Sequence, residues 1–118
     1  MSVTRGDVVV VDWPFAAGAG SKARPALIVQ NDRDNGRLSN TIIVMFTSIT
    51  RRSTETTQLL IDVTTPEGQR TGLHRDCVVN CVNIFTIAQA KIVKRIGSLS
   101  AALMQQVDVC LKTALALP

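Results

Sequence analysis

Short hydrophobic runs, separated by polar or glycine-containing segments, fill most of the chain up to Gly97. Several of them, such as Val8 to Val11 and Ile42 to Phe46, are rich in β-branched residues and show no helical period. Runs of this length and composition predict β-strands. We expect six, at residues 7–12, 24–30, 41–48, 58–63, 77–87 and 91–96.

The period of the pattern changes after Gly97. Leu103, Val107, Leu111 and Leu115 follow one another at steps of four, and Ser100 stands where a helix N-cap is expected. The spacing predicts an amphipathic helix of about four turns. A helix of this length is marginal alone, so it must dock on the sheet or on a second copy of the chain.

Polar segments between the strands are expected to be loops and turns. The segment 31–37 contains Asn35-Gly36, a strong turn signal, and the segment 64–70 contains Pro66 and Gly68. Residues 16–23 form an uncommitted Gly-rich loop that carries Lys22. Six short strands followed by one helix predict a mainly β fold with a C-terminal α-helix, with the sheet strongly bent or closed into a small barrel.

Composition adds limits to this fold. A chain of 118 residues with 46% hydrophobic content is expected to form one domain, residues 1–118, with a real core. Aromatic residues make up only 3%, which argues against RNA recognition by aromatic stacking. The net charge of +4 suits a phosphate-rich partner and equally suits simple solubility.

The three cysteines favour packing over metal binding. The spacing of Cys77 and Cys81 is wider than C-x-x-C and no second pair follows, whereas residues four apart in a strand share a face. Free thiols suit a reducing cytosol, and the first residues lack a signal-peptide pattern. We therefore expect a cytoplasmic protein with no membrane association, and no metal or cofactor motif is present.

Two polar points at strand ends carry the candidate chemistry. Arg24 precedes Pro25 at the start of one strand, and Thr47 and Ser48 end the next. A guanidinium and two hydroxyls that converge on one point could stabilise a phosphodiester in reaction. The alternatives are an arginine that caps a loop and hydroxyls that satisfy loop backbone groups.

The only histidine, His74, lies in a polar turn two residues before Asp76. Imidazole suits general acid or base work near neutral pH, with Asp76 available to orient it. The alternatives are a solvated surface histidine and an aspartate that caps the turn.

The order of these segments resembles the MazF/PemK family of toxin endoribonucleases. The residues that carry the resemblance are Arg5 to Asp12, Arg24 to Asn31, Phe46-Thr47-Ser48, Gly72 to Ile87 and Ile96 through the final helix. The resemblance implies an SH3-like barrel of the MazF, CcdB and Kid toxin type. It also implies a homodimer that cuts single-stranded RNA at short sequences without a metal, and a cognate antitoxin that blocks the RNA groove.

The resemblance also implies roles for residues. Arg24 matches the family's catalytic arginine, and Thr47, with Ser48 beside it, matches the hydroxyl that positions the scissile phosphate. Lys22, Arg51 and Arg52 lie on loops that border the RNA path in such toxins.

The chain departs from the family at one strand. Some plasmid-encoded relatives carry an acid–base Arg and Asp where Asn80 and Val82 stand, and many have Arg in place of Phe85. The chain then either uses a different general base, with His74 and Asp76 as candidates, or cuts RNA slowly. The alternatives are a CcdB-like toxin that poisons DNA gyrase by binding, although the chain lacks an aromatic C-terminal tail, and a non-catalytic RNA-binding barrel.

Overall fold

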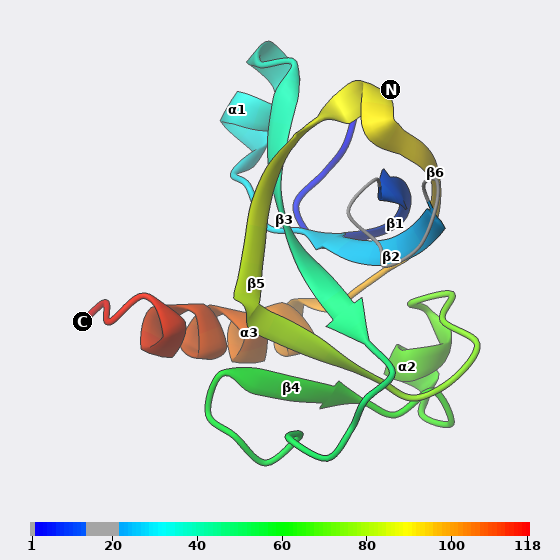
Figure 1. Ribbon diagram of the computed structural model, residues 1–118, viewed down its shortest axis with the longest axis vertical. Coiled ribbons are helices and arrows are strands. Elements are labelled where there is room, and N and C mark those ends of the chain that lie inside the picture. The colour runs from blue at the N-terminus through cyan, green and yellow to red at the C-terminus, as the bar shows by residue number, and fades with distance from the viewer. Residues whose placement is uncertain (1, 14–21) are drawn as a thin grey trace.

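The computed structural model describes residues 2–13 and 22–118. Figure 1 shows a bent antiparallel sheet with one long helix packed against it and two short helices in the connections. The elements are β1 (Asp7–Trp13), β2 (Lys22–Ile28), α1 (Asp32–Arg37), β3 (Asn40–Thr47), β4 (Gln58–Ile61), α2 (Pro66–Gln69), β5 (Cys77–Ala88), a 3-10 turn (Gln89–Lys91), β6 (Ile92–Ser98) and α3 (Ala101–Ala114).

The six strands form a single sheet in the order β4-β5-β3-β2-β1-β6, with every neighbouring pair antiparallel. The prediction of a mainly β fold with a C-terminal helix is confirmed. The sheet is strongly bent, but among the described residues its end strands β4 and β6 do not pair, so the barrel is not closed. No helix in the described part of the chain is long and apolar enough to cross a bilayer.

A bulge divides β5 into two halves. Val44 of β3 pairs with Ile84, but the next residue, Met45, pairs with Asn80, so residues 81–83 have no partner on β3. Extra residues on one strand bend it and increase its twist. The half of β5 before the bulge therefore turns away and also pairs with β4 (Figure 1).

Apolar side chains are buried on both faces of the sheet. Val8 and Leu27 belong to a core that α3 covers, whereas Val9 and Ile28 belong to a second core inside the curl of the sheet. Successive strand residues point to opposite faces, so a strand covered on both sides reads as a continuous apolar run. This explains why residues 8–11 are all valine.

Helix α3 follows the predicted pattern. The Ser100 hydroxyl accepts a hydrogen bond from the Leu103 backbone N–H at 3.2 Å and contacts the Glu67 carboxylate of α2. Val107 is fully buried against the sheet. Cys77, Cys81 and Cys110 form no disulfide and are buried in the same core, which confirms that the first two share a face.

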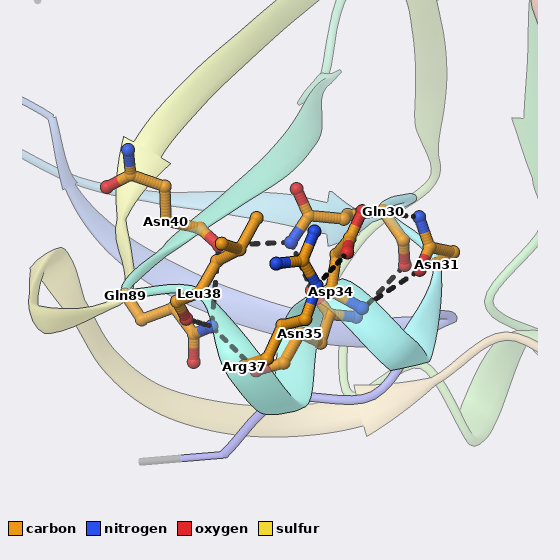
Figure 2. A network of polar contacts seen from close by, with 8 residues as sticks. All are labelled: Gln30, Asn31, Asp34, Asn35, Arg37, Leu38, Asn40 and Gln89. Carbon is orange, nitrogen blue, oxygen red and sulfur yellow. Dashed lines mark hydrogen bonds and ion pairs between the residues drawn. The ribbon is translucent and has the colours of Figure 1, made fainter.

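The segment 31–37 differs from its prediction as a turn-rich loop, because residues 32–37 form helix α1 (Figure 2). Asn31 is its N-cap, and its side-chain oxygen accepts a hydrogen bond from the Asp34 N–H at 2.9 Å. Asp34 in turn pairs with Arg37 at 2.7 Å. The cap and the pairing of charges three residues apart favour a helical turn over a hairpin turn at Asn35-Gly36.

A buried amide network holds α1 against the sheet. The Asn35 side chain, only 4% exposed, donates to the Gln30 carbonyl at 2.9 Å and accepts from the Thr41 hydroxyl at 2.7 Å. From the other side, the Gln89 side chain donates to the carbonyls of Asn35 and Leu38, both at 3.0 Å (Figure 2). These tertiary bonds outweigh the local turn preference. The predicted turn at 64–70 likewise contains a short helix, α2.

Candidate active site

A cavity of about 440 Å³ opens between the polar ends of β2 and β3, the segment before β5, and β6. Arg24, Thr47, Ser48 and His74 all line it. These residues lie far apart in the sequence, and the antiparallel pairing of β1 with β2 and of β2 with β3 brings their strands together. The structure therefore places most of the predicted chemistry around a single hollow.

Arg24 is an exposed residue of β2, opposite Val11 of β1 and next to Pro25. Its guanidinium has no hydrogen bond or ion pair with the described residues. Proline restricts the preceding residue to extended geometry, so the backbone that carries this cation is fixed. A guanidinium on this backbone that has no partner among the described residues is available to an anion that enters the cavity.

Thr47 ends β3, and its hydroxyl oxygen accepts a hydrogen bond from the Ile49 backbone N–H at 3.1 Å. That bond is the local structural role expected of a strand-end threonine. It occupies a lone pair and leaves the hydroxyl proton available to donate. Ser48 follows in an exposed position.

Only one of the two candidate general bases lines the cavity. His74 is exposed and lines the cavity. Asp76 does not line it, and its carboxylate accepts a hydrogen bond from the Val63 backbone N–H at 2.9 Å. Asp76 thus holds the loop after β4 to the start of β5. Within residues 2–13 and 22–118, no three His, Cys, Asp or Glu side chains gather into a group that could hold a metal ion.

The cavity is also lined by two cationic residues that were not predicted from the sequence. Arg75 adjoins His74, and Lys94 lies opposite Val10 where β6 pairs with β1. With Arg24 they give the lining three permanent positive charges, and none of the described lining residues is Asp or Glu. Arg75 could have been found from its neighbour His74, but nothing in the sequence connects Lys94 to Arg24. The lining fits an anion such as a phosphodiester.

The remaining predicted RNA-binding residues lie outside this cavity. Arg51 and Arg52 line a second cavity of about 360 Å³, together with Asn80 and Val82. Thr47 and Ile49 line both cavities, so the two adjoin along the end of β3. The prediction of a loop at Lys22 is wrong, because Lys22 is the exposed first residue of β2, and it lines neither cavity. Residues 16–21 of that predicted loop lie outside the described residues.

Phe85 has a packing role. Its ring meets that of Trp13 edge to face, with the ring centroids 4.7 Å apart.

Gly72 fixes the segment that carries His74 and Arg75. Its φ is +75°, and a Cβ at this position would lie 2.1 Å from the Ile96 carbonyl oxygen of β6. Only glycine adopts this conformation without strain and allows the backbones to approach so closely. The segment is thereby held against β6, where Lys94 lies.

Comparison with known proteins identifies the family. The model of the PemK-like, MazF-like toxins of type II toxin–antitoxin systems matches residues 4–115. This chain belongs to that family.

Individual relatives agree with this assignment. Endoribonuclease MazF6 of Mycobacterium tuberculosis is 32% identical over 117 residues, 98% of each chain. Endoribonuclease EndoA of Bacillus subtilis is 31% identical over 118 residues, which cover 99% of this chain and 97% of EndoA. Among solved structures, a mycobacterial endoribonuclease in complex with its cognate antitoxin superposes with a TM-score of 0.76 at 27% identity, covering 98% of this chain and 97% of that one.

Proposed function

We propose that this protein is the toxin component of a type II toxin–antitoxin system and acts as a sequence-specific, metal-independent endoribonuclease on single-stranded RNA. The observation that carries this proposal is the single cavity lined by Arg24, Thr47 and two further cations. The relatives MazF6 and EndoA are named endoribonucleases, which favours RNA cleavage over a gyrase-poisoning function.

In the proposed reaction, the ribose 2′-oxygen attacks the adjacent phosphorus. The bond from phosphorus to the 5′-oxygen of the next nucleotide then breaks, and that oxygen takes up a proton as it leaves. The products are a 2′,3′-cyclic phosphate and a 5′-hydroxyl. Negative charge accumulates on the phosphoryl oxygens as the 2′-oxygen attacks, and pre-positioned donors stabilise such charge because they need no reorganisation.

Arg24 supplies a positive charge and hydrogen-bond donors for these oxygens. Thr47, held by its bond from the Ile49 N–H, donates its hydroxyl proton to the same phosphate, with Ser48 beside it. Arg75 and Lys94 add to the positive potential that attracts the RNA backbone.

The 2′-hydroxyl proton needs an acceptor. His74 is our candidate for this general base, because it is the one histidine of the chain and lines the same cavity. Asp76 is a weaker candidate, since its carboxylate already binds the Val63 N–H outside the lining. Asn80 and Val82 line the adjoining cavity and carry no group that transfers a proton.

The remaining parts of the proposal concern partners. Arg51, Arg52 and Lys22 contact the RNA backbone on either side of the scissile phosphate. The protein works as a homodimer in the cytoplasm, and a cognate antitoxin covers the cavity. A solved structural neighbour is a complex with its cognate antitoxin, which supports the last point.

The decisive experiment uses the purified protein, freed from any antitoxin, with a long single-stranded RNA in the presence of EDTA. We expect cuts at a short recurring sequence, with 2′,3′-cyclic phosphate and 5′-hydroxyl ends. The matched control is an oligonucleotide with one cut site and a single 2′-deoxy sugar at the attacking position. It should resist cleavage completely.

Each other result has a definite meaning. Cleavage of the deoxy control, or 5′-phosphate ends, would contradict the 2′-oxygen mechanism. Binding of RNA without any cuts would instead identify a non-catalytic RNA-binding protein. Loss of cleavage on addition of EDTA would contradict metal independence.

A further inference from the structure

Gln58 and Asn80 face one another across β4 and β5 and line the second cavity. The Gln58 side-chain nitrogen donates a hydrogen bond to the Asn80 side-chain oxygen at 2.9 Å. Both residues are half-buried. The pair is therefore a fixed polar feature of the cavity wall.

The backbone sets the orientation of both amides. The Val82 N–H donates to the Asn80 side-chain oxygen at 3.3 Å, so the Asn80 nitrogen must point the other way. This oxygen also accepts from Gln58, whose second N–H is directed to the Thr57 hydroxyl at 3.3 Å. The Asn80 oxygen and the Gln58 nitrogen are thereby both fully engaged.

Two polar atoms of the pair remain for a ligand. The Asn80 Nδ2 group has two N–H donors, and the Gln58 Oε1 atom is an acceptor. Neither has a partner among the described residues. In the described part of the chain no buried side-chain nitrogen or oxygen lacks a hydrogen bond, so these two atoms reach solvent. The Gln58–Asn80 pair, which lines the cavity, therefore keeps one donor group and one acceptor atom available to a ligand.

The rest of the lining combines charged groups, Arg51, Arg52 and Glu55, with two apolar side chains. These are Ile49 and Val82, and they are 59% and 57% exposed, among the most exposed large aliphatic residues of the described chain. A flat ligand with apolar faces and a polar edge would cover both while it meets the donor and acceptor. A nucleobase has this form, and every nucleobase carries donors and acceptors along its edge.

We propose that this second cavity binds one nucleobase of the RNA substrate and that the Gln58–Asn80 pair reads its hydrogen-bonding edge. The inference rests on the proposed function of the adjoining cavity, which shares Thr47 and Ile49 with this one. Thr47 and Asn80 line the same cavity, so a phosphate bound at Thr47 would bring a neighbouring nucleotide to the cavity that holds Asn80. Gln58 and Asn80 are thus specificity-determining residues.

The test measures binding to a pool of single-stranded 2′-fluoro RNA with randomised bases, by sequencing of the bound fraction. The 2′-fluoro group cannot attack the phosphate, so the readout does not depend on cleavage. The proteins compared are the unmodified chain, Asn80→Ala, Gln58→Ala and the control Gln106→Ala. Gln106 is an exposed amide of α3 that lines neither cavity.

We expect the unmodified protein to prefer one base at one position by about 5- to 150-fold, the range of a good bidentate contact. Asn80→Ala and Gln58→Ala should both reduce the preference at that same position several-fold. Preferences at the other positions should persist, which shows that both variants are folded. Gln106→Ala should match the unmodified protein throughout.

The inference is overturned if the two variants keep the preference, if they lose it at different positions, or if the unmodified protein shows none. Cleavage of ordinary RNA by the same proteins separates the two proposals. Cuts at an unchanged sequence in both variants would overturn base reading and leave the nuclease intact. Base preference that both variants lose, in a protein that never cuts, would support base reading and overturn the nuclease.

Discussion

Gly36→Ala tests the conformation of the segment 31–37. Gly36 is exposed in α1, its φ is not positive, and an added Cβ would have nothing within 4 Å. Alanine at such a helical position stabilises by about 0.5–1 kcal/mol. The entropy of unfolding is about 2.1 cal/mol/K per residue, so it is about 0.25 kcal/mol/K for the whole chain. The midpoint of thermal unfolding should therefore rise by about 2–4 °C.

Gly72→Ala is the matched contrast, since the same atoms are added where they do not fit. A left-handed φ of +75° costs alanine about 1–2 kcal/mol. The approach of the new Cβ to the Ile96 carbonyl oxygen adds to that cost. The midpoint should fall by at least about 4–8 °C. Circular dichroism at one fixed protein concentration measures both changes, because any dimer makes the midpoint concentration-dependent.

A hairpin turn at Asn35-Gly36 would require a positive φ at Gly36, and alanine there would be destabilising. A midpoint lowered by Gly36→Ala would therefore refute helix α1. An unchanged midpoint in Gly72→Ala would refute the tight contact between this segment and β6.

Three further predictions concern the amide network of Asn35, the thiol of Cys81 and the positive charge of Lys94. Asn35→Ala should lower the free energy of unfolding in urea by about 2–3 kcal/mol, because the buried Thr41 hydroxyl loses its acceptor, and a loss below about 0.5 kcal/mol would contradict this. Burial, and next the neighbouring Cys110, raises the pKa of Cys81 from about 9 to about 12. The folded protein keeps this proton where the unfolded chain loses it, so the stabilisation is complete below pH 9 and declines from pH 9 to 12. Cys81→Ala should weaken the decline in urea unfolding at high pH, and an identical decline would contradict the assignment. Lys94→Ala should weaken RNA binding equally for all sequences and reduce the salt slope of binding by about 0.7, whereas an unchanged slope would show that Lys94 contacts no phosphate.

Most of the sheet could be predicted because its signals are local. Continuous β-branched runs and the change of period at Ser100 are properties of neighbouring residues, and they place all six strands and α3 to within about two residues at most boundaries. The bulge in β5 could not be predicted, since it depends on which residues of β3 lie opposite.

Helix α1 shows the opposite case. Its Asn-Gly pair is a strong local turn signal. The local Asn31 cap opposes that signal, and further hydrogen bonds to α1 come from Gln30, Thr41 and Gln89. Such contacts exist only after the sheet has formed. The turn preference of Asn35-Gly36 is thus real, but the contacts of the folded chain outweigh it.

The candidate site likewise contains residues that the sequence predicted and residues that it did not. Thr47 ends β3 and Arg24 lies near the start of β2, where a sequence pattern can place them. Lys94 and Arg75 joined them only through strand pairing and a tight glycine contact. The base-binding pair of Gln58 and Asn80 depends on the register of β4 and β5, which the sequence did not show.

The central claim is that Arg24 and Thr47 act on the same phosphate. Its most direct test is a double-mutant cycle of single-turnover RNA cleavage with Arg24→Ala, Thr47→Ala and the double variant. Thr47→Ser, which keeps a hydroxyl, serves as the control. Each alanine variant should lose about 10²–10³-fold, as for a pre-positioned donor to a developing oxyanion.

Residues that work as a unit give losses that are far from additive. If the two effects were independent, the loss in the double variant would be the product of the two single losses. We predict that the double variant cuts at least about tenfold faster than this, which corresponds to a coupling of about 1.4 kcal/mol. Independent losses, or an Arg24→Ala variant that cuts at the unmodified rate, would contradict the account.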